Sequence, residues 1–136
     1  MKTLAALLLL LGVASQAEAH RLAPSYLELR EEGAGTFAVL WRTPSVVARG
    51  ARLAPQLPCP ASGETRATEE PAALVLRWRI QCAEGLVDHE LRVDGLAGSG
   101  SDALVRIEFA DGRELQAVLS AARPALRVPA RIIHTV

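Results

Sequence analysis

The sequence predicts an all-β protein: a single antiparallel β-sandwich of seven to eight strands, with one disulfide. Apolar and polar residues alternate with a period of two along most of the chain, which is typical of half-buried strands. Turn signals rich in glycine, proline and aspartate separate these segments at close spacing, as they do in sandwiches. After the first nineteen residues, no stretch shows the periodicity of an amphipathic helix, and no internal repeat is present.

Residues 1–19 are predicted to be a signal peptide that is cleaved after Ala19. Lys2 supplies a positive start, residues 4–13 form an uncharged apolar run, and Ala17 and Ala19 occupy the positions that signal peptidase reads. The run is shorter than the roughly 20 residues that cross a bilayer, so an uncleaved anchor is the weaker alternative. We therefore expect a periplasmic or secreted chain that begins at His20 and is not stably inserted in a membrane.

The length of the remaining chain indicates one domain, and its charge argues against two classes of partner. Residues 20–130 provide enough chain for one domain, and residues 131–136 are expected to be a tail. The whole sequence has 15 Lys plus Arg and 15 Asp plus Glu. Because this formal charge is balanced, nucleic acid and anionic membrane surfaces are not expected to be the main partners.

The first two predicted strands, residues 25–31 and 36–42, form a hairpin. The turn between them reads EGAG, and its glycines can adopt a positive φ. Residues 44–72 contain several prolines and are predicted to be a loop, with an edge strand near residues 52–57. Alternate side chains of the hairpin share one apolar face: Leu27, Leu29, Phe37, Val39 and Trp41.

Four further segments show the pattern of strands. Residues 73–82 and 87–94 alternate, and residues 103–120 form a second hairpin around Asp111-Gly112, a strong short-range hairpin signal. A short strand is expected at residues 125–129, and residues 96–102 are expected to form a flexible loop. The side chains predicted to point inward from the first two segments are Leu74, Leu76, Trp78, Ile80, Val87, His89, Leu91 and Val93. The charges predicted to point outward, as cross-strand pairs, are Glu28, Arg77, Arg79, Glu90, Arg92, Arg106 and Glu108.

The two cysteines, Cys59 and Cys82, are predicted to form the disulfide. An even number of cysteines in an exported chain favours a bridge. The loop that it closes, about 24 residues, should contribute roughly 3 kcal/mol in the chain-entropy model. The alternative is a thiolate metal site, which is the weaker interpretation because the sequence has no C-x-x-C and no histidine near either cysteine.

Two histidines are candidate metal ligands. A mature chain beginning at His20 would offer its α-amine and its imidazole to one ion, with Cu(II) favoured and Ni(II) next. The alternative is that His20 is a solvated residue that signal peptidase tolerates. His89 lies between two inward residues, which favours a packed, hydrogen-bonded histidine over a ligand, and His134 falls in the tail. No cofactor is otherwise indicated.

Catalysis has little support, so the chain is expected not to be an enzyme. The sequence contains neither G-x-S-x-G nor H-E-x-x-H, and a disulfide would leave no cysteine as nucleophile. Asp88, His89 and Glu90 alternate faces if they lie on a strand, so they cannot converge. A hydrolase on a sandwich scaffold remains the least supported alternative.

Residues 19–44 resemble the start of the extracytoplasmic N-terminal domain of HupE/UreJ family proteins. In that family a signal peptide is followed by His, then P-x-Y-L-E-L-R-E, a glycine turn and F-x-V-x-W-x-x-P. The similarity covers about residues 19–130 and diagnoses a domain rather than a reaction. The matching residues are Pro24, Tyr26, Leu27, Glu28, Leu29, Phe37, Val39, Trp41, Pro44, Trp78, Cys82, Gly95, Leu96, Asp102, Leu104, Val105 and Arg106.

The resemblance implies a link to nickel or cobalt uptake, which in the family belongs to membrane helices carrying H-I-x-x-G-x-D-H. The sequence reaches Val136 without that segment, so transport does not carry over. A truncated gene, a split gene and a free-standing domain all remain open. We therefore expect a periplasmic accessory or binding module beside a HupE/UreJ-type membrane partner. The alternative is a periplasmic copper- or nickel-binding protein that uses His20.

Overall fold

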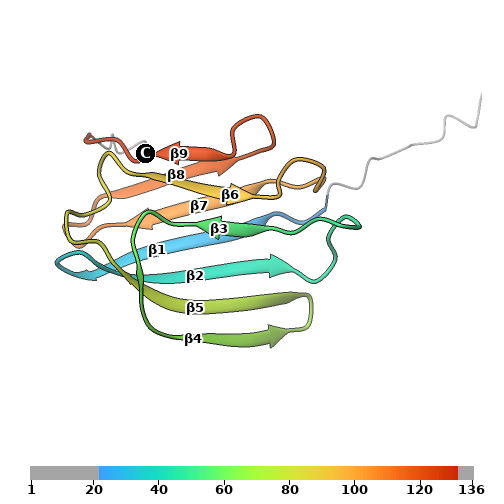
Figure 1. The fold of residues 1–136 in the computed structure, drawn as a ribbon, viewed down its shortest axis with the longest axis horizontal. Coiled ribbons are helices and arrows are strands. Elements are labelled where there is room, and N and C mark those ends of the chain that lie inside the picture. Colours follow the sequence, from blue (N-terminus) through green and yellow to red (C-terminus); the bar gives the residue numbers. More distant parts are fainter. Residues whose placement is uncertain (1–21, 132–136) are drawn as a thin grey trace, which may run out of the picture.

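Nine strands and no helix make up residues 22–131, the part of the chain that the computed structural model describes (Figure 1). The all-β prediction is confirmed. The predicted signal peptide, His20 and His134 lie outside the described residues. Within them, no helix is long and apolar enough to cross a membrane. The strands are β1 (Ser25–Gly33), β2 (Thr36–Pro44), β3 (Ala54–Gln56), β4 (Ala61–Glu70), β5 (Ala73–Gln81), β6 (Glu90–Asp94), β7 (Ala103–Glu108), β8 (Glu114–Leu119) and β9 (Ala125–Arg127).

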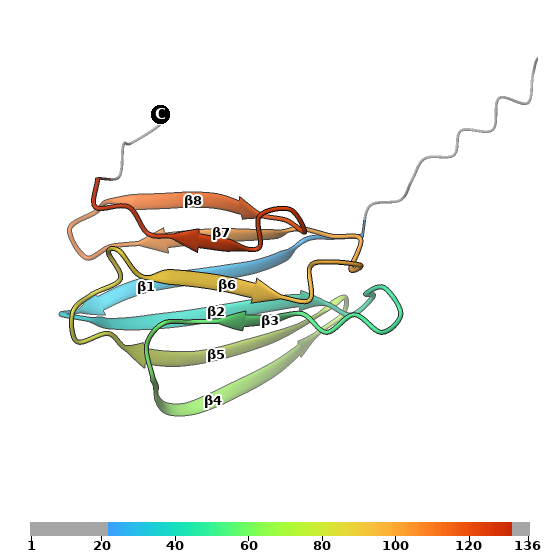
Figure 2. The same ribbon diagram turned by 45° about the horizontal axis from the view of Figure 1, so that its top comes forward.

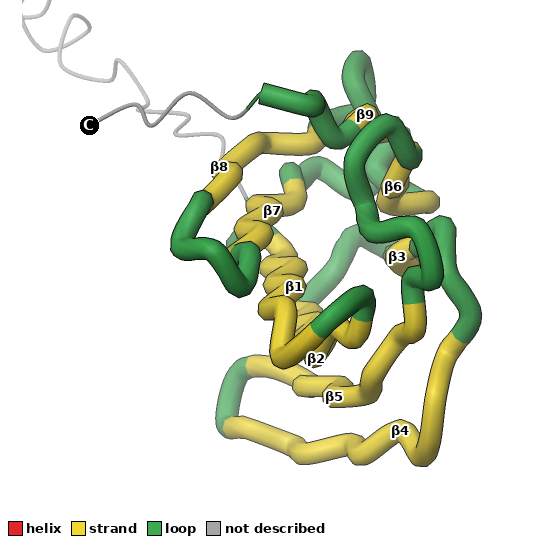
Figure 3. Tube along the Cα trace, turned by 90° about the vertical axis from the view of Figure 1, so that its left-hand side faces the viewer, coloured by secondary structure: helices red, strands yellow, loops and turns green. Residues whose placement is uncertain are grey.

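The strands form two layers, as expected of a sandwich. The larger sheet has the order β4-β5-β2-β1-β7-β8, and the smaller has the order β3-β6-β9. Figures 2 and 3 show the smaller sheet lying against one side of the larger, which curves around it. One face of the larger sheet is therefore part of the core. The opposite face, here called the outer face, has no second layer within the described residues.

One strand pairing departs from the antiparallel prediction. β1 and β7 run parallel, with Tyr26 opposite Leu104 and Glu28 opposite Arg106, so the larger sheet is mixed. The chain between these strands passes through the smaller sheet, and β7 then enters beside β1 in the same direction. Alternation along a strand shows on which face each side chain lies, but not the direction of the neighbouring strand. The sequence therefore could not reveal the parallel pairing of β1 and β7.

The core fills the space between the sheets and confirms the face predicted for the first hairpin. Leu27, Leu29 and Phe37 are fully buried, and the ring of Phe37 meets that of Phe109 edge-on, with centroids 6.3 Å apart. The remaining buried members of the main cluster are Val39, Trp41, Ile80, Cys82, Leu86, Leu91, Val93, Leu96, Ala103, Val105, Ile107, Leu119 and Val128.

Two predictions about β4 and β5 were wrong. β4 lies in the segment predicted to be a loop. The sequence did not reveal this strand, because all ten of its residues are exposed and leave no alternating pattern. β3 does fall at the predicted edge strand. In β5, Leu74 was predicted to point into the core but is 40% exposed, because the buried residues at the start of this strand are its neighbours Ala73 and Val75. Leu76 and Trp78 pack only partly against the core.

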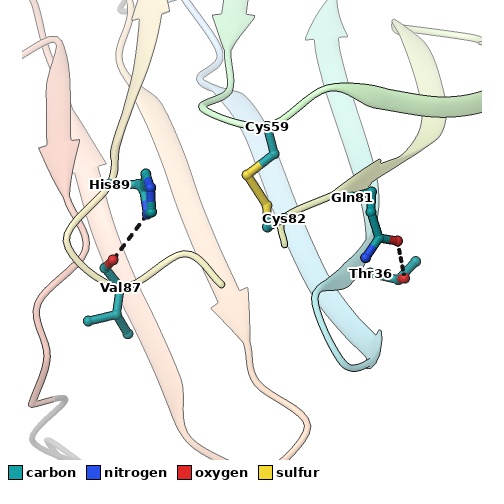
Figure 4. Close-up of a disulfide and its surroundings, with 6 residues drawn as sticks. All are labelled: Thr36, Cys59, Gln81, Cys82, Val87 and His89. Atoms are coloured by element: carbon teal, nitrogen blue, oxygen red, sulfur yellow. Dashed lines mark hydrogen bonds between the residues drawn. A yellow bond between two sulfur atoms is a disulfide. The ribbon is translucent and has the colours of Figure 1, made fainter. Parts of the chain in front are cut away.

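The predicted disulfide is present and ties the connection between β3 and β4 to the end of β5. Cys59 follows β3 of the smaller sheet, and Cys82 follows β5 of the larger one (Figure 4). The turn between β1 and β2 packs against the same point, since the amide of Cys82 donates to the carbonyl of Gly35 at 2.7 Å. Gly35 has a φ of 77°, and a Cβ there would lie 2.2 Å from the Cys82 carbonyl oxygen. Only glycine therefore fits the predicted turn without displacing the backbone that follows β5.

Two buried serines provide a matched test of core packing. Ser25 is fully buried, and its Oγ has no hydrogen-bond partner among the described residues. Replacing Ser25 with alanine should therefore leave the free energy of unfolding unchanged or raise it by up to about 1 kcal/mol, because an unpaired buried hydroxyl is destabilising. Urea denaturation with an unchanged m-value measures this.

Ser99 is the control for this experiment. It is equally buried, but its Oγ donates to the Leu96 carbonyl at 2.7 Å. Ser99→Ala should lower stability by about 1–2 kcal/mol. Equal losses in both variants would contradict an unpaired Ser25 hydroxyl.

Candidate functional site

The outer face of the larger sheet brings together side chains from both ends of the described chain. The parallel register aligns Glu28 with Arg106, and Arg30 with Glu108, so opposite charges face each other in two successive rows. The rows continue onto β8, where Gln116 lies opposite Arg106. These side chains come from strands separated by more than seventy residues in the sequence, and only the β1–β7 pairing brings them together.

A network of ion pairs runs across β1, β7 and β8 on this face. Arg30 Nε lies 3.2 Å from Glu108 Oε2, and Arg106 Nε lies 2.9 Å from Glu114 Oε1. Glu28 lies between these pairs, 3.6 Å from Arg30 and 3.9 Å from Arg106. The outward pairing predicted for Glu28, Arg106 and Glu108 is therefore confirmed. Exposed pairs of this kind contribute at most about 1 kcal/mol each, so the network orders the surface more than it stabilises the fold.

Arg79, also predicted to pair, does so with Glu32, with Nε 2.8 Å from Oε2. The other outward charges do not follow that prediction. Among the described residues, Arg77, Glu90 and Arg92 have no ion pair.

Tyr26 is hydrogen-bonded to this network and is partly buried. Its hydroxyl donates to Glu28 Oε2 at 2.7 Å. Burial raises the pKa of Tyr26, and the hydrogen bond to Glu28 raises it further. Hydrogen bonds to Glu114 are the main cause of a raised pKa at Arg106. Burial and the Glu28 carboxylate thus favour the neutral, donating form of Tyr26.

The raised pKa of Tyr26 can be measured directly, because the sequence contains one tyrosine. Absorbance near 295 nm should report a titration midpoint above the ordinary value of 10.0, and denaturant should return it to that value. The pKa of Tyr26 is higher in the folded chain than in the unfolded chain. The hydrogen bond from Tyr26 to Glu28 therefore stabilises the fold below about pH 10, and this contribution is lost as pH rises through the folded pKa. Glu28→Gln should lower the midpoint; an unchanged midpoint would show that Glu28 does not accept this hydrogen bond.

An apolar patch adjoins the network at one end of the outer face. Leu104 and Val118 lie opposite each other on β7 and β8 and are 39% and 57% exposed. Tyr26 is next to Leu104 on β1. Both apolar side chains line an open hollow of about 610 Å³, together with Leu22, Ala23, Pro24 and Ala121. We call Tyr26, Leu104 and Val118 the apolar patch. It was missed in the sequence, although Leu104 and Val118 share the outward parity of Arg106 and Gln116 and could have revealed it.

Of the two histidines predicted as metal ligands, His89 lies in the described part of the chain and His20 lies outside it. His89 lies in a turn before β6 rather than on the strand, because Asp88 has a φ of 64° and the strand begins at Glu90. The side chain of His89 is half-buried, and its Nδ1 lies 3.1 Å from the Val87 carbonyl oxygen (Figure 4). The cysteines are bonded to each other. Among residues 22–131 no group of three or more His, Cys, Asp or Glu side chains could hold a metal ion.

No protein-family model matches the chain, and no curated protein matches it in sequence.

Proposed function

We propose that this protein is a non-enzymatic, extracytoplasmic accessory module that binds a membrane protein of the HupE/UreJ type through its outer face. The observation that carries the proposal is the apolar patch, whose two exposed aliphatic side chains, Leu104 and Val118, lie beside an ordered network of charges. Protein interfaces commonly combine an apolar centre with a polar rim. The outer face has this composition, and no other layer covers it within the described residues.

The residues behind the HupE/UreJ resemblance support the choice of face. Tyr26 and Glu28 belong to its first motif, and Leu104 and Arg106 belong to its last. In the structure these four side chains form two adjacent rows on the outer face. Such clustering is expected if the motifs describe a shared recognition surface as well as a shared fold.

The proposed location rests on the leader sequence and on the cysteines. The first nineteen residues have the layout of a signal peptide. The Cys59–Cys82 disulfide requires an oxidising compartment to persist. Export and the bridge thus support the same site of action, on the outer side of the cytoplasmic membrane.

A binding measurement tests the proposal. The purified chain is titrated with a HupE/UreJ-type membrane protein in lipid nanodiscs, as wild type and as Val118→Arg. The substitution should weaken binding by about tenfold or more, because a charge would enter the apolar centre of the interface. Val46→Arg is the matched control, since Val46 is 71% exposed in the loop after β2 and is not part of the apolar patch. Equal affinities for all three forms would overturn the proposed face.

Copper or nickel binding is the second candidate function. The bond from His89 to the Val87 carbonyl favours a proton on Nδ1, which leaves Nε2 with a lone pair for a metal. Titration of the exported chain with Cu(II) and Ni(II) tests this function, with a form carrying one extra glycine before His20 as the control. Tight binding that the extra glycine removes would support a site at His20. Weak binding by both forms would exclude metal binding, and equally tight binding by both would place the site away from the α-amine of His20.

A further inference from the structure

A second region of the outer face, around β4 and β5, carries arginines that have no ion pair. Arg66 and Arg77 lie directly opposite each other in the antiparallel register of these strands, and both are exposed. Like charges in this position destabilise a sheet. The other arginines on the strands of this face each pair with a glutamate: Arg30, Arg42, Arg79 and Arg106. Within residues 22–131, Arg66 and Arg77 have no ion pair.

The two arginines border an open groove. The groove has a volume of about 630 Å³, and Ala38 and Leu40 of β2 also line it. Its charged lining includes Glu28 and Glu32, which already pair with Arg106 and Arg79 respectively, and Glu64, which has no ion pair among the described residues. Arg66 and Arg77 therefore supply positive charge that the paired glutamates do not neutralise.

The chemistry of this groove suits a carboxylate. A guanidinium group presents parallel N–H donors that match the two oxygens of a carboxylate, and two such groups side by side can hold one or two of them. Ala38 and Leu40 give the aliphatic stem of a glutamate a surface to pack on. Glu64 lies where the β4 register shifts between Ser62 and Arg66, so it flanks the arginines rather than facing them across the strands.

We propose that this groove binds an acidic segment of the partner protein, with Arg66 and Arg77 pairing with its carboxylates. The inference rests on the proposed function, because it assigns chemistry to the partner expected at the outer face. A protein segment fits better than a small anion, since the groove is open and belongs to the same uncovered sheet face as the apolar patch. One partner could therefore contact both regions.

The probe is a capped peptide with two glutamates separated by one valine. Its binding is measured from the amide chemical shifts of the whole exported chain. The expected result is saturable shifts at Leu40, Arg66 and Arg77. Arg66→Gln and Arg77→Gln should each weaken binding by about two- to fivefold, the effect of one exposed charge pair. Arg92→Gln is the control, because Arg92 is an exposed strand arginine of the smaller sheet with no ion pair among the described residues. Glu64→Gln should tighten binding, because it removes a competing negative charge.

Three results would overturn the inference. The first is equal binding of a peptide whose glutamates are replaced by glutamines. The second is an Arg92→Gln loss as large as those of the groove variants. The third is saturation by sulfate alone with no shift from the acidic peptide, which would assign the groove to small anions. If the peptide fails while the Val118→Arg effect on the membrane partner holds, the proposed function stands without this groove.

Discussion

Replacing Phe37 with alanine should lower the free energy of unfolding by about 3–5 kcal/mol, the largest effect expected of any substitution considered for this protein. Phe37 is fully buried on β2 and packs edge-on against Phe109. Its removal leaves a cavity that the surrounding sheets cannot close, because β1 and β5 hold β2 on both sides. Urea denaturation measures the loss.

Val118→Ala is the control for Phe37→Ala. Val118 is 57% exposed, so its truncation should change stability by no more than about 0.5 kcal/mol. A loss at Phe37 no larger than that at Val118 would contradict the assignment of β2 to the centre of the core. The same control shows whether the apolar patch can be altered without unfolding the protein, which the binding experiments require.

Removal of the disulfide is expected to have the second largest effect. The double variant Cys59→Ala, Cys82→Ala should lose roughly 3 kcal/mol, because the bridge closes a loop between positions 23 apart and restricts the unfolded chain. Thermal or urea unfolding of the variant, beside the wild type with and without a reducing agent, measures the effect.

The disulfide experiment also shows whether the bridge stabilises the protein by restricting the unfolded chain or by packing in the core. If the bridge acts through the unfolded chain, the reduced wild type and the double variant should lose similar amounts of stability. A much larger loss in the variant would instead indicate that packing of the buried Cys82 sulfur carries the effect. Loss of partner binding in a variant that remains folded would mean that the bridge shapes the surface as well as the fold.

The strands that bury one face could be predicted from the sequence. β1, β2 and β7 alternate strictly between buried and partly exposed or exposed side chains over most of their length, because their core face is covered by the smaller sheet. The Asp111-Gly112 turn placed the β7–β8 hairpin correctly. The disulfide was predicted from the even number of cysteines and from the signal-peptide pattern, which are both features of the sequence and need no tertiary structure.

The features that could not be predicted from the sequence depend on contacts with neighbouring chain segments. β4 is recognisable only from its pairing with β5, since its own side chains are all exposed. His89 has the parity of a core residue, but the backbone of Asp88 turns the chain just before the strand begins. Both errors arise where a local pattern is overridden by the arrangement of adjacent chain segments.

The candidate site shows the same limit. The outward side chains Glu28 and Arg106 could each be assigned to a solvated face. Their contact depends on the parallel pairing of β1 and β7, which the alternation does not encode. The facing of Arg66 and Arg77 likewise requires the register of a strand that the sequence did not reveal.

Site-specific photo-crosslinking in cells tests most directly whether the outer face binds a HupE/UreJ-type membrane protein. A photoreactive residue replaces Val118 on the outer face or, as control, Arg92 on the smaller sheet, in cells that produce both proteins. The proposed function predicts a crosslinked adduct with the membrane protein from position 118 and none from position 92. No adduct from position 118, or equal adducts from both positions, would contradict it.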